Sequence, residues 1–117
     1  GSLEQLDRLL EGADILIAGP DVDMSDLSAR FPLLVAMTVS DFGSTDRFQN
    51  WQGSGAVYHA LTGELSRSGV PGRPPLLPPG DLAHSCASVQ GAYVVLLAYY
   101  NRLASGRGDI LEDGTAR

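Results

Sequence analysis

Two short apolar segments lie near the start of the chain, and turn residues bound both of them. Residues 13–18 read Ala-Asp-Ile-Leu-Ile-Ala and precede Gly19-Pro20, while residues 33–40 read Leu-Leu-Val-Ala-Met-Thr-Val-Ser. Runs of this length, apolar at consecutive positions, are typical of strands that are covered on both faces, as in parallel sheets. The pattern therefore predicts two buried strands.

Helical periodicity surrounds these two segments. Residues 2–11 place their leucines on one helical face, begin with a capping-box pair and precede Gly12, which favours a helix end. Residues 24–30 predict a short helix that the following Phe-Pro pair terminates. Residues 55–65 predict a third helix. We expect four of its side chains to face inward: Val57, Ala60, Leu61 and Leu65.

The second half of the chain begins with a proline-rich segment and continues with a long apolar one. Five prolines in residues 71–79 remove backbone donors and fix φ, which predicts a stiff, extended connector. Asp81 suits the N-cap of a helix of about 20 residues, roughly 30 Å long, that ends at Ser105-Gly106. Polar residues in its first half predict a buried helix rather than a membrane span. We expect the polar tail that follows to be frayed.

The order of helix, buried strand, short helix and buried strand predicts an α/β fold. We expect a parallel sheet with flanking helices and one long C-terminal helix. Two strands are too few for an independent sheet, so we expect it to be incomplete on its own. Further strands would come from the rest of a longer chain, from a second copy, or from a segment assigned otherwise. Unpaired edges also lead us to expect self-association.

Composition narrows the class of protein. The 117 residues allow one domain, and 44% hydrophobic residues indicate a globular core. A formal net charge of -6, with 8 scattered basic residues, argues against a nucleic-acid partner. Because the lone Cys86 cannot form an internal disulfide, we expect a cytoplasmic location. The polar residues in the long apolar segment lead us to expect no membrane partner.

The densest group of reactive side chains lies in residues 80–87, Gly-Asp-Leu-Ala-His-Ser-Cys-Ala. His84, the serine after it and Cys86 are adjacent, so a helix spreads them over about 200° and they do not form a catalytic triad. His59 and His84 supply at most two metal ligands, and we expect no metal site. We interpret Cys86 as a small buried core residue. Trp51 is expected to be partly buried against the helix that follows it.

The order of several short motifs along the chain is more informative than any one of them. They are Ala-Asp-Ile-Leu-Ile-Ala-Gly-Pro, a strand ending in Ser-Asp-Phe-Gly, the helix of residues 55–65, a Pro-Pro connector, and a long helix closed by Ser-Gly-Arg-Gly. This series resembles the central stretch of the class III CoA-transferase family, which includes formyl-CoA transferase, carnitine CoA-transferases and α-methylacyl-CoA racemase. The resemblance covers about residues 12–108. We assign residues 1–108 to one family-like α/β segment and residues 109–117 to a polar tail.

The resemblance implies a Rossmann-like fold that binds CoA thioesters, in a longer chain that usually forms an interlocked dimer. In these transferases an aspartate at the start of the long helix attacks the acyl-CoA and then becomes an aspartyl-CoA thioester. Counting back from Gly106 without gaps places His84 at that position, three residues after Asp81. Asp81 is then the best remaining candidate carboxylate. Arg47 and Arg73 are candidate contacts for the CoA phosphates.

Two hypotheses for function follow from this resemblance. In the first, the segment belongs to a protein that transfers CoA between an acyl-CoA and a carboxylate, with racemisation of a thioester as the related alternative. In the second, the segment is a catalytically degenerate structural or partner-binding domain, with His84 in place of the nucleophile and no carboxylate at helical spacing to orient its ring. The expected partners are a small acyl-CoA and either a second copy or the other half of a larger chain.

Overall fold

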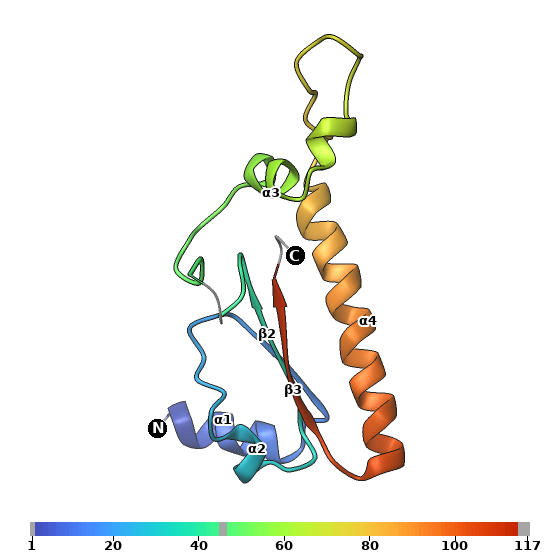
Figure 1. Ribbon diagram of the computed structural model, residues 1–117. Helices are drawn as coiled ribbons and strands as arrows, with labels where there is room; N and C mark the ends of the chain where they lie inside the picture. The colour runs from blue at the N-terminus through green and yellow to red at the C-terminus, as the bar shows by residue number, and fades with distance from the viewer. Residues whose placement is uncertain (1, 45–46, 115–117) are drawn as a thin grey trace.

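The computed structural model describes residues 2–44 and 47–114, and Figure 1 shows how its elements follow one another. In chain order they are α1 (Ser2–Glu11), β1 (Ile15–Ala18), α2 (Leu27–Arg30), β2 (Val35–Ser40), α3 (Gly55–Leu61), the 3₁₀ helix η1 (Glu64–Arg67), α4 (Leu82–Ser105) and β3 (Asp109–Gly114). The predicted α/β class, with a parallel sheet and a long C-terminal helix, is confirmed.

The three strands form one parallel sheet in the order β1-β2-β3. Ile15 pairs with Val35 where the first ladder begins, and Val35 pairs with Asp109 where the second begins. Both strands predicted from apolar runs are present. The expectation that they are buried holds for the first half of β2 but is wrong for β1, where no residue is buried and Ile17 is 58% exposed. The expectation of a frayed tail is wrong for residues 109–114, because β3 pairs with β2 along its whole length. Residues 115–117 of that tail lie outside the described residues.

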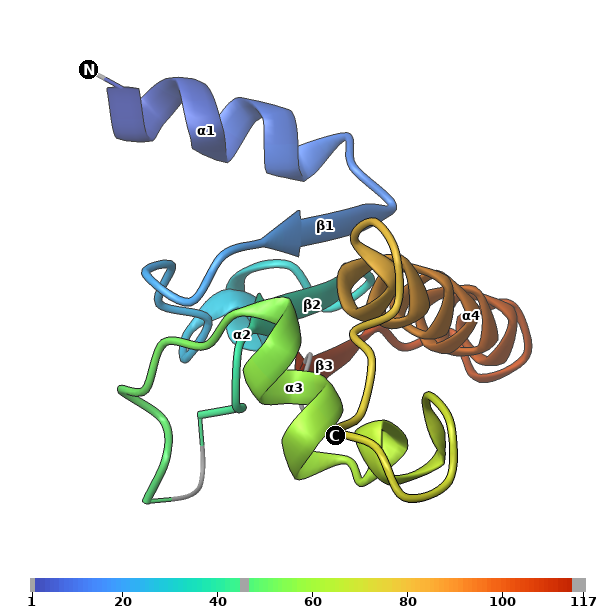
Figure 2. The same cartoon turned by 90° about the horizontal axis from the view of Figure 1, so that it is seen from above.

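A different set of helices covers each face of the sheet. One core cluster joins β2 and the residue before it to α1 and α2: Leu10, Leu27, Leu34 and Ala36. A second cluster joins β2 to α4: Val35, Met37, Val95 and Ala98. Figure 2 shows α2 and α4 on opposite sides of the strands. The central strand is therefore covered on both faces, as its continuous apolar sequence predicts.

Helix α4 approaches the sheet through small side chains. A Cβ at Gly91 would lie 2.9 Å from Oδ2 of Asp113 and 3.0 Å from Cε of Met37. Glycine therefore lets the helix backbone come closer to the strands than any other residue would. The other buried residues of the helix are Ala83, Val95 and Ala98.

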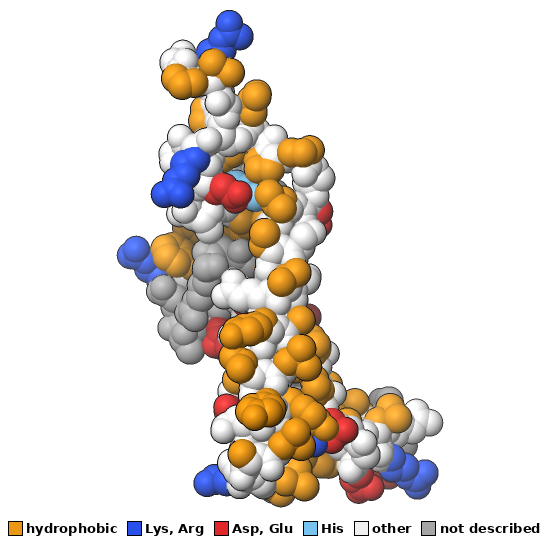
Figure 3. Space-filling model, turned by 90° about the vertical axis from the view of Figure 1, so that its right-hand side faces the viewer, with side chains coloured by type: hydrophobic (Ala, Val, Ile, Leu, Met, Phe, Trp, Pro, Cys, Tyr) orange, Lys and Arg blue, Asp and Glu red, His pale blue; other side chains and the backbone are white. Residues whose placement is uncertain are grey.

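Most of α4 is exposed in this chain, so the expectation of a buried helix is wrong for its outer face. Figure 3 shows hydrophobic side chains gathered along the helix. The large exposed ones are Val89, Tyr93, Leu96, Leu97, Tyr100 and Leu103. By length and composition alone, α4 would also be able to cross a membrane. In the fold its inner face packs on the sheet instead.

Helix α3 is shorter than predicted and buries a different face. It ends at Leu61, and η1 follows Gly63, whose φ of 78° favours glycine. Val57 and Leu61, two of the predicted inward residues, are exposed, while Tyr58 and His59 are buried. Figure 1 shows the reason: α3 lies across the upper end of the sheet and meets the start of α4, rather than lying along a sheet face.

Candidate active site

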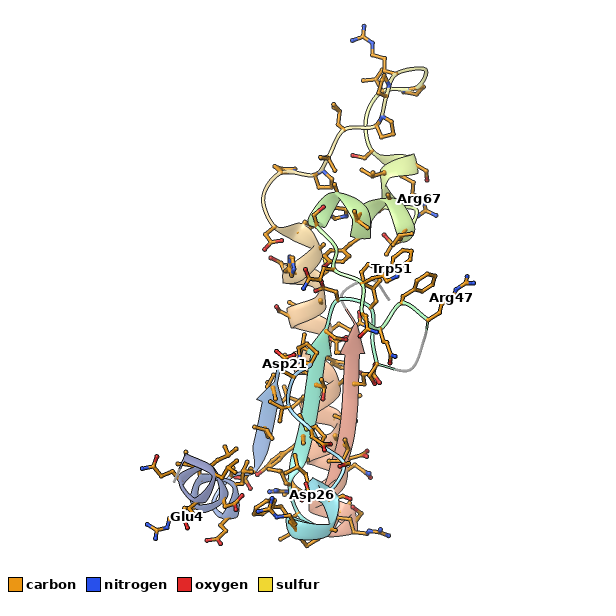
Figure 4. All side chains as sticks on the ribbon, turned by 90° about the vertical axis from the view of Figure 1, so that its left-hand side faces the viewer. Glu4, Asp21, Asp26, Arg47, Trp51 and Arg67 are labelled. Atoms are coloured by element: carbon orange, nitrogen blue, oxygen red, sulfur yellow. The ribbon has the colours of Figure 1, made fainter. Side chains whose placement is uncertain are left out.

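A cleft opens at the carboxyl end of the sheet, between the loops after β1 and β2 and the first turn of α4. Its volume is about 710 Å³. Ligands of open parallel sheets bind at this edge, beyond the carboxyl ends of the strands. Its polar side chains are Asp21, Thr38, Ser40, Asp41, Ser44, Gln49, Asn50, Gln52 and His84. Figure 4 shows Asp21 and Trp51 near the upper ends of the strands.

The first turn of α4 brings together the two predicted catalytic residues, Asp81 and His84. Asp81 is the N-cap residue, but its side chain makes no capping hydrogen bond. Its Oδ1 atom lies 2.5 Å from Nδ1 of His84 instead. The expectation that no carboxylate orients the His84 ring is therefore wrong, because residues three apart share a helix face. His84 lines the cleft, whereas the Asp81 side chain is 70% exposed and lies outside the described lining.

Tyr58 lies against His84, and the sequence pattern does not mark it. The two rings meet edge to face, with their centroids 5.6 Å apart. Tyr58 is buried, and its hydroxyl makes no hydrogen bond of normal geometry within the described residues. Burial raises the pKa of Tyr58 to about 12, and so does the Asp41 carboxylate, which lies close enough to the Tyr58 hydroxyl to accept a hydrogen bond from it. Its hydroxyl is therefore a hydrogen-bond donor at neutral pH.

Asp41 directly follows β2, and a Gly-rich loop holds its carboxylate. The Gly53 N–H donates to Oδ2 of Asp41 at 3.1 Å. A Cβ at Gly53 would lie 2.3 Å from Cε1 of Tyr58, so only glycine lets the loop backbone lie against this ring. Asp41, Tyr58 and His84 are therefore neighbours in space. The Asp-Phe-Gly motif marks Asp41 in the sequence, but its approach to Tyr58 depends on where α3 lies.

An aromatic cluster supports the loop beside the cleft. Phe42 contacts Trp51 and Tyr58, with ring centroids 6.2 and 5.8 Å apart respectively. Phe48 lies 4.7 Å from Trp51 between ring centroids. Trp51 itself is 56% exposed, so the expectation that it is partly buried against the following helix is wrong. Its ring packs on the two phenylalanines of its own loop region instead.

The two candidate phosphate contacts lie on different segments. Arg47 is on the loop after β2, where its guanidinium carbon lies 4.8 Å from the centre of the Phe48 ring (Figure 4). Arg73 belongs to the proline-rich connector, which projects beyond α3 in Figure 1. Neither arginine is among the described residues that line the cleft, whereas the carboxylates of Asp21 and Asp41 are.

A second, smaller pocket of about 170 Å³ lies behind Tyr58, between α3 and α4. Buried His59 places Nδ1 2.5 Å from Oε2 of Glu64 there. Cys86 also lines this pocket and is exposed, so the interpretation of Cys86 as a buried core residue is wrong. Across residues 2–44 and 47–114, no three His, Cys, Asp or Glu side chains form a group that could hold a metal ion.

The parallel sheet, its two helical layers and the cleft at its carboxyl edge define an α/β protein. A sequence profile of CoA-transferase family III matches residues 1–114. The chain therefore belongs to CoA-transferase family III.

Named relatives agree with this family. The chain is 36% identical over 123 residues to "Probable CoA-transferase Rv1866" of Mycobacterium tuberculosis. This match covers 94% of the chain and 16% of that protein. It is 33% identical over 89 residues to the succinyl-CoA–L-malate CoA-transferase alpha subunit of Chloroflexus aurantiacus, covering 75% of this chain and 21% of the relative. The chain therefore spans only about a sixth to a fifth of these relatives.

Solved structures show the same fold. A CAIB/BAIF family protein from Brucella suis superposes with a TM-score of 0.88 at 21% identity, over 97% of this chain and 32% of that one. The protein Rv3272 from M. tuberculosis superposes with a TM-score of 0.84 at 22% identity, over 98% and 35% of the two chains. At this level of identity the likeness concerns the fold alone.

Proposed function

We propose that the protein containing this segment transfers CoA between an acyl-CoA and a carboxylate, with CoA handled as the substrate thioester. Family membership over residues 1–114 supports this reaction class. The observation that carries the proposal for the segment itself is the cleft at the carboxyl edge of the sheet, bordered by the first turn of α4. Relatives named as succinyl-CoA transferases support acyl-CoA as the substrate class.

The charges around the cleft suggest where each part of the substrate binds. Asp21 and Asp41 would repel the CoA phosphates, because like charges placed close together raise the binding free energy. We propose that the thioester enters the cleft and that the phosphates stay outside it. Arg47, on the loop next to the cleft, is the proposed phosphate contact, with Arg73 on the connector as a more distant one.

Isotope exchange in the full-length protein tests this function. The protein is incubated with succinyl-CoA and isotopically labelled succinate, and in parallel with acetyl-CoA and labelled acetate. We expect label to enter the CoA thioester, detected by mass spectrometry. Complete absence of exchange with every pair of a panel of acyl-CoAs and carboxylates would contradict the proposal.

A glycine variant shows whether the reaction uses this cleft. In Gly53→Ala the new Cβ would collide with the Tyr58 ring and displace the loop from Asp41. We expect exchange to fall at least about tenfold, because small displacements of a site reduce rates steeply. Gly19→Ala is the matched control, since a Cβ there meets nothing within 4 Å. Equal exchange by both variants would place the reaction elsewhere in the protein.

A second candidate function is a degenerate domain that supports catalysis by another part of the chain or by a partner. The presence of His84 at the position that the family resemblance gives to the nucleophile favours it, because an imidazole cannot form the aspartyl-CoA thioester. The M. tuberculosis relative is also a much longer chain than the C. aurantiacus one. The match of 123 residues covers only 16% of the former, whereas the match of 89 residues covers 21% of the latter. A longer chain has room for a separate catalytic half.

The full-length His84→Ala variant tests this second function. A degenerate domain predicts an exchange rate within about twofold of the unmodified protein, because His84 would then touch no reacting atom. A fall of more than about tenfold, with an unchanged melting temperature, would contradict it.

We further propose that the protein is cytoplasmic and assembles with a second copy or with a complementing half. The two open sheet edges and the exposed apolar face of α4 support assembly. Relatives named as subunits, including the succinyl-CoA:(R)-benzylsuccinate CoA-transferase subunit BbsE of Thauera aromatica, agree with it. Light scattering of the full-length protein is the test, and a stable monomer would contradict assembly with a second copy.

A further inference from the structure

A third pocket continues from the cleft into the space between the sheet and α4. It encloses about 220 Å³. Val39 and His84 line both this pocket and the cleft, so the two spaces adjoin. A substrate whose reacting group lies in the cleft beside His84 would extend the rest of its chain into this pocket. The full lining is Ile17, Met37, Val39, His84, Ala87, Ser88, Gly91, Ala92 and Asp113.

The register of the sheet explains why these strand residues share one pocket. Alternate residues of a strand point to the same face, and Met37 packs on α4 in the second core cluster. Ile17 pairs with Met37, and Asp113 pairs with Val39. All four side chains therefore face the helix. The helix backbone comes close to them at Gly91, where a Cβ would lie 2.9 Å from Oδ2 of Asp113.

The pocket suits a short and largely apolar group. Most of its walls are aliphatic or methyl side chains, and burial of apolar surface against such walls favours binding. Its volume holds roughly seven groups the size of a water molecule, which is enough for an acyl chain of a few carbons. The apolar wall residues are Ile17, Met37, Val39, Ala87 and Ala92.

Asp113 places one carboxylate in these apolar surroundings. Burial raises the pKa of Asp113, although the backbone N–H of Gly114 lowers it in part. No cation lies within ion-pair distance of Asp113 among residues 2–44 and 47–114. His84, the other titratable residue of the lining, is bound to Asp81. A second carboxylate that entered the pocket would therefore meet an unneutralised like charge in a poorly solvated space.

We propose that this pocket binds the acyl chain of the substrate thioester and selects short acyl groups without negative charge, because Asp113 repels the second carboxylate of a dicarboxylic acyl group. This rests on the proposed CoA-transferase function and narrows it to monocarboxylic substrates. Several relatives are named for succinyl-CoA, whose acyl group carries a second carboxylate. The preference expected for this chain differs from those names.

Competing exchange reactions in the full-length protein test the role of charge. Butyryl-CoA with labelled butyrate is compared with succinyl-CoA and labelled succinate, because the two acyl groups have equal chain length and differ in the terminal carboxylate. We expect kcat/KM to be at least about tenfold higher for butyryl-CoA. In Asp113→Asn we expect this ratio to fall at least about fivefold. Asp109→Asn, at the exposed opposite end of β3, is the matched control and should keep the ratio.

A size variant tests where the acyl chain lies. Ala92 is exposed on α4 and lines the pocket, so Ala92→Leu should fold normally and narrow the space. We expect kcat/KM to fall at least about fivefold for butyryl-CoA and to change less than about twofold for acetyl-CoA, whose chain is shorter. Ala104→Leu, exposed on the same helix and outside the described lining, is the control.

The failure of each proposal gives a different result. A preference for succinyl-CoA, or a preference for butyryl-CoA that Asp113→Asn leaves unchanged, overturns the selectivity and leaves the transferase function standing. An equal change in Asp109→Asn, or equal effects of Ala92→Leu on both chain lengths, overturns it as well. Absence of exchange with every acyl-CoA overturns the transferase function and this inference with it. If Asp113→Asn does not fold, the preference of the unmodified protein and the Ala92→Leu result decide.

Discussion

The two ends of the sheet are built in contrasting ways. At the amino end, Arg102 near the end of α4 donates to the carbonyl oxygen of Leu33 at 2.7 Å and to Oδ1 of Asp14 at 2.5 Å. The N–H of Gly108 donates to the carbonyl oxygen of Pro32 at 2.8 Å. At the carboxyl end, the Tyr58 hydroxyl makes no hydrogen bond of normal geometry within the described residues, and burial raises the pKa of Asp113.

The contrast indicates that residues at the amino end of the sheet stabilise the fold, whereas residues at the carboxyl end form the candidate site. At the amino end, the polar contacts of Arg102 and Gly108 fix where α4 ends and β3 begins. The carboxyl end keeps polar groups that are only partly satisfied, which is typical of sites that bind ligands. Substitutions at the amino end should therefore reduce stability, and matched substitutions at the carboxyl end should leave stability unchanged or raise it.

The largest effect is expected for Gly108→Ala. Its Cβ would lie 2.0 Å from the carbonyl oxygen of Leu34, a backbone atom that cannot move aside without disturbing β2. We expect a loss of about 3–4 kcal/mol in unfolding free energy and rapid hydrogen exchange throughout β3. Gly19→Ala, with open space around the new Cβ, serves as the comparison. Equal stability of the two variants would show that the amino end of the sheet is not tightly built.

A smaller loss is expected for Arg102→Met. The arginine side chain is 13% exposed, and removing it leaves the Leu33 carbonyl oxygen and the Asp14 carboxylate without their partner. Arg30→Met is the matched variant, because Arg30 pairs with Asp7 at 2.6 Å but is 43% exposed. Exposed ion pairs contribute little. Thermal melting should therefore place Arg102→Met clearly below Arg30→Met, and the reverse order would contradict the comparison.

Tyr58→Phe is expected to change stability by no more than about 1 kcal/mol, because the buried hydroxyl makes no hydrogen bond of normal geometry and has only the nearby Asp41 carboxylate as a partner. Tyr93→Phe, on the exposed face of α4, is the control. Marked destabilisation by Tyr58→Phe would mean that the hydroxyl does bind a partner in the folded protein.

The pH dependence of Tyr58 has a definite sign. Its folded-state pKa of about 12 lies above the ordinary value of 10.0, so the folded protein binds the phenolic proton more tightly than the unfolded chain does. The resulting stabilisation is fully present below pH 10 and is lost as the pH rises from 10 to 12. Chemical denaturation across this range should show a decline that is shallower in Tyr58→Phe. Identical slopes would argue against the raised pKa.

The smallest effect is expected for Asp113→Asn. Burial raises the pKa of Asp113, although the backbone N–H of Gly114 lowers it in part. A raised carboxyl pKa means that the ionised form destabilises the fold at neutral pH, so the amide variant should be slightly more stable at pH 7. The advantage should shrink as the pH falls toward the ordinary value of 3.8. A variant that is less stable at pH 7 would show that the charge has a favourable partner.

Local sequence determined much of the fold and the family. The continuous apolar runs of β1 and β2 indicate a parallel sheet without any knowledge of the structure, although only β2 contains buried residues. The Asp-Phe-Gly turn, the proline-rich connector and the Ser-Gly-Arg-Gly helix end follow from local backbone preferences. Their order was enough to indicate the family, which the match over residues 1–114 confirms.

Tertiary structure alone decided β3 and the site. Residues 109–114 have too few apolar side chains to read as a strand, and they become one because β2 offers them a complete row of backbone partners. The outer residues of α4 are exposed because no described element packs on that side of the helix. Cys86 is exposed as well, at the pocket between α3 and α4. Asp41, Tyr58 and His84 come from three separate segments. They meet because α3 crosses the end of the sheet, a placement fixed by packing between distant segments rather than by any local pattern.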